Sequence, residues 1–195
     1  MTTSPALQTP GGFESGVIEI QGRSFARELQ GLSGTNLNRC FHCQSCAAGC
    51  PFIQAMDYSP NKIIRLVQFG LRRQALESRA IWVCVGCSTC AAECPNQVDL
   101  PAVMEALRHL ALKEGVKVAA PEILDFHREV FSSVRRHGRT HELGIILRYK
   151  ARVRSWFTDL NLGLKMLARR KLDLRASKVK ATKEISGIFL PQRQR

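Results

Sequence analysis

Two copies of one cysteine pattern constrain this chain more than any other feature of its sequence. Its eight cysteines all fall into two runs with the same spacing, Cys40-x2-Cys43-x2-Cys46-x3-Cys50-Pro51 and Cys84-x2-Cys87-x2-Cys90-x3-Cys94-Pro95. Three thiolates at positions i, i+3 and i+6 curl around one face of an iron–sulfur cubane. The fourth thiolate of the run cannot reach the same cube and binds the other one. The pattern therefore predicts two [4Fe–4S] clusters, each with four thiolates.

The predicted ligand sets are crossed between the two runs. We expect the first cluster to bind Cys40, Cys43, Cys46 and Cys94, and the second to bind Cys84, Cys87, Cys90 and Cys50. The proline after each run fixes φ and turns the chain away from the cluster. Three aromatic residues flank the cysteines, namely Phe41, Phe52 and Trp82. They either shield the clusters from water, which lowers the reduction potential, or take part in ordinary packing.

Two other uses of the cysteines fit this pattern less well. Structural zinc sites usually take two Cys-x2-Cys pairs separated by a long loop, whereas here four cysteines lie close together in each run. A disulfide framework requires an oxidising compartment. Residues 1–30 have neither the basic start nor the apolar core of a signal peptide, so we expect a cytoplasmic protein.

The segment between the two runs predicts helices and no sheet. Ser59 is a suitable N-cap, Pro60 suits the first helical position, and Gly70 is a natural C-terminal stop. Four apolar residues share one face of this helix, namely Ile63, Ile64, Val67 and Leu71. A second short helix is expected at residues 72–78. The predicted fold class is therefore all-α, with an α-helical ferredoxin core that carries the two clusters.

Helical extensions are expected on both sides of this core. We predict a mobile tail at residues 1–16, a ferredoxin domain with two clusters at 17–116, and a basic helical extension at 117–195. Ser24 is a candidate N-cap near the start of the domain, and proline and glycine bound one helix from Pro101 to Gly115 and another from Pro121 to Gly138. The latter has an apolar face made by Ile123, Phe126, Val130, Phe131 and Val134.

The net charge of +13 is concentrated in the C-terminal extension. Residues 117–195 carry nineteen Lys and Arg against seven Asp and Glu, whereas residues 1–116 carry ten against nine. Such a segment either docks onto an acidic partner protein or forms a solvated helical face. Nucleic acid is not expected as a partner, because the basic residues are not interleaved with stacking aromatics. No run of about 18 apolar residues is present, so no membrane span is predicted.

The sequence shows no active site of its own. Neither of the glycine-rich nucleotide motifs occurs, and the zinc-protease pattern that begins at His141-Glu142 fails because position 145 is Ile. Since every cysteine is a predicted cluster ligand, no free thiol remains for substrate chemistry. We therefore expect a non-catalytic electron-transfer subunit of an oxidoreductase complex.

The chain resembles the C subunit of heterodisulfide reductase, including the related protein of sulfur-oxidising bacteria. The resemblance is carried by "CFHCQSCAAGCP", "SPNKIIRLVQFG" and "ALESRAIWVCVGCSTCAAECPNQVDL", and continues weakly through "LNLGLKMLARRKLDL" and "KEISGIFLP". It implies an α-helical ferredoxin core that passes electrons between two partners, the flavin-bearing A subunit of the complex and its catalytic, cysteine-rich B subunit. The duplicated cysteine-rich motif of that catalytic partner is absent here, so the resemblance assigns no disulfide chemistry to this chain.

An alternative function is the iron–sulfur subunit of another dehydrogenase, such as a glycerol-3-phosphate, glycolate or succinate/fumarate enzyme. Those subunits often fuse the same helical core to a plant-type ferredoxin domain or to a cysteine-rich domain. Neither addition is present in this sequence, which favours the first interpretation. The sequence leaves open the disulfide, thiol or sulfur substrate and the direction of electron flow.

Overall fold

The computed structural model describes residues 22–153, 165–166, 168–169 and 179–189. All regular elements within these ranges are helices, so the predicted all-α fold class is confirmed. The tail predicted at residues 1–16 lies outside the described residues, as do parts of the predicted C-terminal extension. Within the described ranges, no helix is both long and apolar enough to cross a bilayer.

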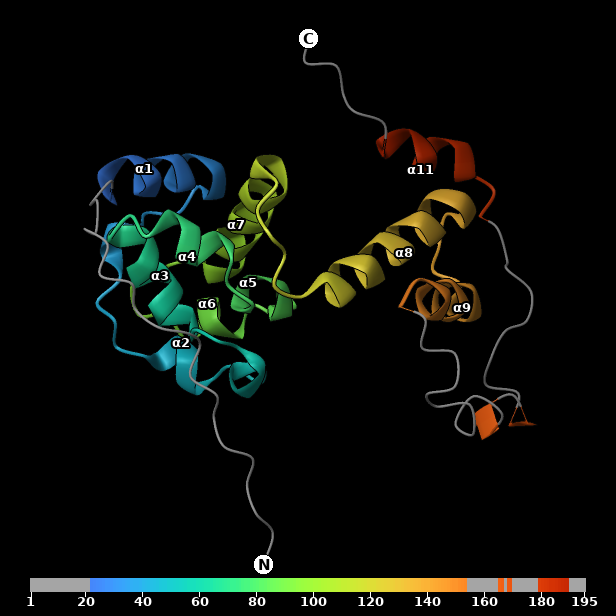
Figure 1. The fold of residues 1–195 in the computed structure, drawn as a ribbon, viewed down its shortest axis with the longest axis horizontal. Helices are drawn as coiled ribbons and strands as arrows, with labels where there is room; N and C mark the ends of the chain where they lie inside the picture. Colours follow the sequence, from blue (N-terminus) through green and yellow to red (C-terminus); the bar gives the residue numbers. More distant parts are fainter. Residues whose placement is uncertain (1–21, 154–164, 167, 170–178, 190–195) are drawn as a thin grey trace, which may run out of the picture.

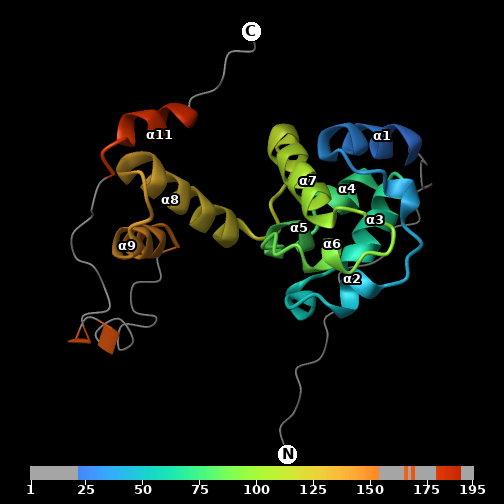
Figure 2. The ribbon, with the colours of Figure 1, turned by 180° about the vertical axis from the view of Figure 1, so that it is seen from behind.

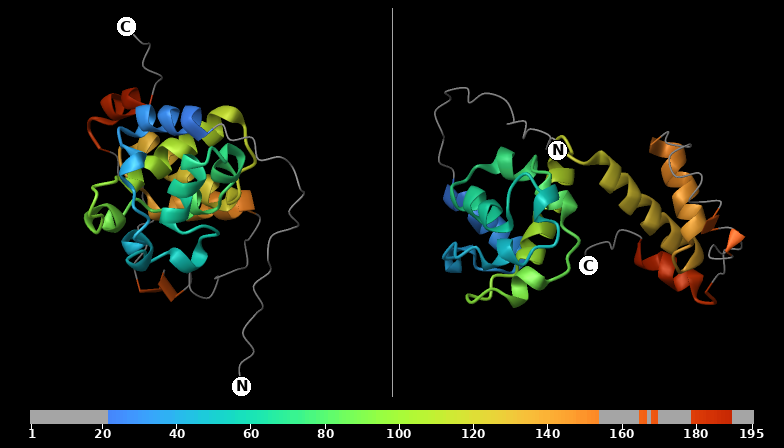
Figure 3. Two further views of the ribbon diagram at one scale, coloured as in Figure 1. Left: turned by 90° about the vertical axis from the view of Figure 1, so that its left-hand side faces the viewer. Right: turned by 90° about the horizontal axis from the view of Figure 1, so that it is seen from below.

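The helices form two groups, which Figure 1 shows side by side. The cluster body contains α1 (Gly22–Ser33), η1 (Leu37–Arg39), α2 (Ser45–Ala48), η2 (Ile53–Ala55), α3 (Pro60–Gln68), α4 (Arg72–Leu76), α5 (Ala80–Val83), α6 (Thr89–Ala92) and α7 (Leu100–Glu114). The C-terminal lobe contains α8 (Pro121–His137), α9 (Glu142–Val153) and α11 (Thr182–Ile188). Figures 2 and 3 show from other sides that α8 leads away from the body toward α9 and α11.

Helix α3 forms where the linker sequence predicts it. Ser59 occupies the N-cap position with extended backbone, Pro60 begins the helix, and Gly70 follows its end at a φ of 71°. The Ser59 hydroxyl, however, donates to Oδ1 of Asn61 at 2.8 Å, and it does not bond a backbone N–H of the first turn. The apolar face of α3 enters the core, since Ile63, Ile64 and Val67 are fully buried.

The core of the body lies between α7 and the shorter helices around it. Asp99 caps α7 by accepting a hydrogen bond from the Ala102 amide at 3.1 Å, and Gly115 ends the helix at a φ of 66°. Helix α1 packs against both α7 and α3. The largest fully buried side chains are Trp82, Leu29, Leu37, Ile63, Ile64, Leu76, Ile81, Met104 and Leu107.

One arginine joins three helices of the body at its surface. The Arg72 guanidinium on α4 binds Glu28 of α1 at 2.6 Å and also forms an ion pair with Glu114 of α7. Its Cζ lies over the ring of Phe25, 4.8 Å from the centroid. These contacts hold α1, α4 and α7 together.

Helix α8 has the predicted bounds, but its most deeply buried side chains are polar. Phe126 and Phe131 are 43% and 61% exposed, whereas Glu129 and Ser133 are buried. The polar side of α8 faces α9, where Arg152 binds Glu129 at 2.8 Å. Within the apolar stripe, Ile123 packs half-buried against the core of the body, Phe126 makes an edge-on ring contact with Tyr149 of α9, and Phe131 makes one with Phe189.

Candidate iron–sulfur site

The two cysteine runs fold in the same way. Each has a left-handed residue between its first two cysteines, His42 at a φ of 57° and Gly86 at 66°. Each has a second left-handed residue after its second cysteine, Gln44 at 67° and Ser88 at 62°. A one-turn helix follows in each run, α2 in the first and α6 in the second. These repeated reversals bend the chain so that three cysteines of a run face one side.

The fourth cysteine of each run lies just beyond the end of this short helix, and its amide is hydrogen-bonded to the helix. The Cys50 amide donates to the Ala47 carbonyl at 3.3 Å, and the Cys94 amide donates to the Ala91 carbonyl at 3.3 Å. Helices α2 and α6 contact each other, so the two runs lie side by side as related units. This contact brings the end of each run next to the start of the other.

Four cysteines line a first cavity of about 350 Å³, which includes its opening to solvent, and they are Cys40, Cys43, Cys46 and Cys94. The inner wall of this cavity is apolar and includes Ile64, Val98 and Leu100. The Val98 amide donates a hydrogen bond of 3.3 Å to the Cys94 sulfur. Such N–H···S bonds stabilise negative charge on a thiolate and raise the potential of a cluster that it binds.

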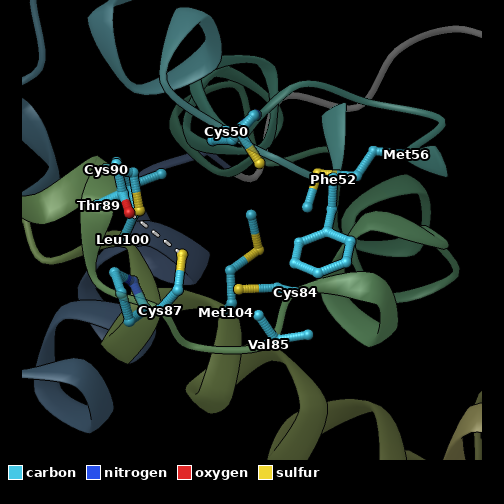
Figure 4. A pocket seen from close by; sticks show the side chains of 12 residues that line it. Cys50, Phe52, Met56, Cys84, Val85, Cys87, Thr89, Cys90, Leu100 and Met104 are labelled. Atoms are coloured by element: carbon cyan, nitrogen blue, oxygen red, sulfur yellow. Dashed lines mark hydrogen bonds between the residues drawn. The ribbon is translucent and has the colours of Figure 1, made fainter. Parts of the chain in front are cut away.

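Four cysteines line a second cavity of about 400 Å³, and they are Cys50, Cys84, Cys87 and Cys90. Figure 4 shows their side chains around one space, with Met104 and Phe52 beside them. Leu100 lines both cavities, so the two sites are separated by little more than one side chain. The structure thus brings the fourth cysteine of each run to the three leading cysteines of the other.

The donor sets fit two [4Fe–4S] clusters. Each cavity offers four thiols and no competing oxygen-rich ligand set, which is the chemistry that cubanes bind. In the part of the chain that the structure describes, no three His, Cys, Asp or Glu side chains converge as ligands of a single metal ion. A cubane has four irons, each with its own thiolate, so its ligands stand farther apart than those of one ion.

The thiols of each set differ in pKa. Burial raises the pKa of Cys46 to about 11, and the charges of the neighbouring cysteines add to the rise. Burial likewise raises the pKa of Cys90 to about 11. The Ser45 hydroxyl lowers the pKa of Cys43, and the Thr89 hydroxyl lowers that of Cys87. Cys43 and Cys87 are thus the thiols that ionise more easily. Ionisation of Cys46 and Cys90 depends on the positive charge of the irons in a bound cluster.

Asp57 anchors the second run, although no sequence pattern singles it out. Its carboxylate accepts hydrogen bonds from the Ser78 hydroxyl at 2.9 Å and from the Arg79 and Ala80 amides at 2.7 and 2.8 Å. These amides lie at the start of α5, which leads directly into Cys84. The carboxylate therefore caps α5 from a distant part of the chain, which a search for local capping patterns does not find.

Arg108 also supports the second run. Its guanidinium donates to the backbone carbonyls of Ile81 and Cys84 and forms an ion pair with Glu105 at 2.8 Å. It thereby ties α7 to the end of α5, where Cys84 begins the run. No spacing signal marks this residue, because the contact joins backbone and side chain across the fold.

In the first run, His42 is held by the end of α3. The Gln68 amide nitrogen donates to the Leu37 carbonyl at 2.8 Å, which directs its oxygen to Nε2 of His42 at 2.9 Å. Because that oxygen can only accept, Nε2 carries the proton. The equivalent position of the second run is Gly86, so the two cavities differ here.

The three aromatic residues that flank the cysteines have different environments. Phe41 is 77% exposed at the mouth of the first cavity, and Phe52 lines the second. Trp82 is buried in the hydrophobic core and does not line either cavity. Trp82 therefore takes part in core packing, and Phe41 does not shield the first cavity from solvent.

Comparisons with known proteins also indicate a domain that binds two [4Fe–4S] clusters. Residues 36–98 match the family of the 4Fe-4S dicluster domain. The chain is 34% identical over 82 residues to the C subunit of ferredoxin:CoB-CoM heterodisulfide reductase of Methanosarcina acetivorans, covering 42% of this chain and 33% of the relative. It is 29% identical over 98 residues to the C subunit of H(2):CoB-CoM heterodisulfide,ferredoxin reductase of Methanothermobacter thermautotrophicus, covering 50% of this chain and 53% of the relative.

A third relative, the iron-sulfur C subunit of CoB–CoM heterodisulfide reductase of Methanopyrus kandleri, is 32% identical over 85 residues, covering 44% of each chain. The matched region spans a third to about half of the length of these relatives. The likeness covers 42–50% of this chain, and the expected resemblance to the C subunits of heterodisulfide reductases is confirmed.

Proposed function

We propose that this chain is the electron-transfer subunit of a heterodisulfide reductase-like complex. It relays single electrons through two [4Fe–4S] clusters between two partner proteins. One partner bears a flavin, and the other is catalytic and cysteine-rich and acts on disulfide, thiol or sulfur substrates. The observation that carries the proposal is the pair of adjacent four-thiol cavities that share Leu100. Two clusters so close together would exchange electrons directly.

The proposed ligand sets are crossed, with Cys94 completing the first set and Cys50 completing the second. This assignment is supported by the cavities, each of which is lined by three cysteines of one run and the fourth of the other. The contact between α2 and α6, which places the two runs side by side, also supports it.

Each of the two sites has a cysteine ligand that is exposed on the surface, where a partner protein can approach it. Cys43 and Cys87 are exposed, and their sulfurs lie 3.4 Å from the Ser45 hydroxyl and 3.5 Å from the Thr89 hydroxyl. Each cavity thus has one ligand at the surface, and Cys46 of the first set is buried, whereas Cys50, Cys84 and Cys90 of the second set are half-buried. The bound clusters would supply one-electron chemistry, while a flavin in a partner supplies the exchange between one and two electrons.

Two measurements test this function: the iron and sulfide content of the chain, and its redox activity with and without the partner subunits. Anaerobically prepared chain should contain about eight irons and eight sulfides and should pass electrons to a one-electron dye. It should not reduce a disulfide until the flavin-bearing and cysteine-rich subunits are added. Stoichiometric zinc without visible charge-transfer absorption, or rapid disulfide reduction by the chain alone, would overturn the proposal.

A further inference from the structure

An exposed aromatic side chain and a cation lie at the mouth of the first cysteine-lined cavity. Phe41, which directly follows Cys40, lines this cavity and is 77% exposed. Arg39, which directly precedes Cys40, is also exposed. A large apolar side chain that is exposed beside a redox site gives a partner protein something to bury there.

Helix α3 extends this surface away from the cavity. Lys62, Arg65 and Phe69 lie at i, i+3 and i+7 and are exposed on one face of the helix and just after its end. The Arg65 Cζ lies 5.4 Å from the centroid of the Phe69 ring. The Arg65 Nη1 lies 3.5 Å from the Gln68 oxygen, which in turn bonds His42 of the first run. The exposed face of α3 is therefore joined to the first cluster loop by direct contacts.

The cations of this surface, which we call the basic rim (Arg39, Lys62 and Arg65), form no ion pair with a carboxylate of the described residues. By contrast, Arg72 and Arg73 of α4 are both paired. No Asp or Glu occurs in residues 35–56 or 58–76, and none lines the first cavity. Asp57, between these ranges, is bound to the start of α5. The charge of the basic rim is therefore available to an acidic partner.

The second run has the opposite charge. Residues 80–107 contain three acidic residues and no Lys or Arg. The arginines on either side of this segment, Arg79 and Arg108, are each paired with a carboxylate. Of the three acidic residues, Glu93 lies beside Gly49 at the end of α2, and it lines neither cavity. The two halves of the pseudo-repeat thus differ in charge although they share one cysteine spacing.

We propose that the mouth of the first cavity, with the basic rim and the exposed Phe41 and Phe69, is the docking surface for an acidic partner protein that exchanges electrons with the first cluster. Carboxylates of this partner face the basic rim, and an apolar side chain of the partner covers Phe41. Like charges repel the same partner from the second run, so the two partners of the relay meet different clusters. This assignment rests on the proposed relay function and specifies which cluster meets the acidic partner.

Binding measurements with the cluster-loaded full chain test this surface. The probes are two purified subunits from the same organism, the flavin-bearing one and the cysteine-rich one, each measured separately. The variants are Phe41→Ser, Lys62→Glu and Arg65→Glu. The matched controls are Leu32→Ser, which removes an apolar side chain that is 57% exposed, and Lys117→Glu, which reverses an exposed charge; neither residue lines a cysteine cavity. Visible cluster absorption of each variant shows that it is folded and loaded.

We expect one of the two subunits to bind about tenfold or more weakly to all three variants and unchanged to both controls. The effect of Lys62→Glu and Arg65→Glu should shrink in high salt, because the exposed charges are then screened. Carbodiimide, which joins an amine to a carboxylate that touches it, should couple the Lys62 amine to an Asp or Glu of the same subunit. The other subunit should bind all of these chains like wild type.

Several results would overturn the docking surface but leave the relay function intact. They are wild-type-like affinity of both subunits for the three variants, tighter binding to Lys62→Glu and Arg65→Glu, and weaker self-association of the chain as the only effect. If neither subunit binds the wild-type chain, the docking surface and the relay function both fail. Should Phe41→Ser lose its clusters, the two charge reversals on α3 decide the question.

Discussion

At the scale of single residues, the second cluster site depends on side chains that are far from it in sequence. Asp57 lies in the linker, yet it accepts from the amides of Arg79 and Ala80 that begin α5. A carboxylate at the N-terminus of a helix satisfies otherwise unpaired amides and interacts favourably with the helix dipole. The position of Cys84 is therefore coupled to a residue near the end of the first run.

Replacing Asp57 with Ala should destabilise the protein by about 1–2 kcal/mol, since it removes the cap and leaves the two amides without this acceptor. The effect should be larger on the second cluster than on the first. Thermal unfolding and the rate of cluster loss on exposure to a chelator would measure it. Glu77→Ala is the control, because it removes a partly exposed carboxylate that pairs with Arg73 and lines neither cysteine cavity.

The crossed ligand assignment can be tested at Cys94. Cys94→Ser should perturb the cluster bound by Cys40, Cys43 and Cys46, because Cys94 lines their cavity. Cys50→Ser should perturb the other cluster in the same way. Electron paramagnetic resonance of the reduced variants separates the two clusters. Damage confined to the cluster of the substituted run would contradict the crossed sets.

At the scale of elements, the positions of proline and glycine predicted the ends of the longer helices well. Proline at the start and glycine at the end bound α3, α7 and α8, because these residues restrict the backbone in a way that depends little on tertiary context. The four-residue helices α2, α5 and α6 were not predicted. Each is too short for a periodic signal, and each is set by the turns of a run or, for α5, by the Asp57 cap.

The sequence also did not predict which side chains of α8 are buried. Its apolar residues define one face in the sequence, but α9 packs against Glu129 as well as against Phe126, whose ring contacts Tyr149. Arg152 makes this polar contact possible by binding Glu129. Amphipathic periodicity identifies an apolar face, and it does not say whether the chain itself or another protein covers that face.

The contacts of Arg72 give a prediction for the packing of α1, α4 and α7. Its hydrogen bond to Glu28 lowers the pKa of that carboxyl below its ordinary value. The stabilisation is therefore present at neutral pH and is lost as the pH falls through the lowered pKa. Arg72→Met should lower the free energy of unfolding by about 1 kcal/mol at pH 7, since the pair is partly exposed. The difference in melting temperature between wild type and variant should shrink as the medium is acidified, and a constant difference would exclude the ion pairs as its cause.

At the scale of the whole molecule, the chain separates cluster binding from its basic charge. All eight cysteines lie in the cluster body, and the C-terminal lobe contacts that body mainly through α8 and α5. An ion pair of 3.5 Å between Arg79 and Glu122 spans the same junction. The cysteine pattern predicted two [4Fe–4S] clusters because ligand spacing fixes local geometry. It carried no information on how the lobe packs.

Removal of residues 154–195 tests what the distal basic charge does. This truncation deletes eleven Lys and Arg and three Asp and Glu but retains α8, α9 and the Arg152–Glu129 pair. Both clusters should remain, because no proposed ligand lies beyond Cys94, and iron and sulfide analysis would measure this. If this charge docks onto an acidic face of a partner subunit, the affinity for that subunit should fall most at low salt, since attraction between exposed charges is screened over about 8 Å at physiological ionic strength. The salt dependence of binding should therefore become shallower in the truncated chain. An identical salt dependence in both chains would instead indicate that this charge forms a solvated surface and takes no part in docking.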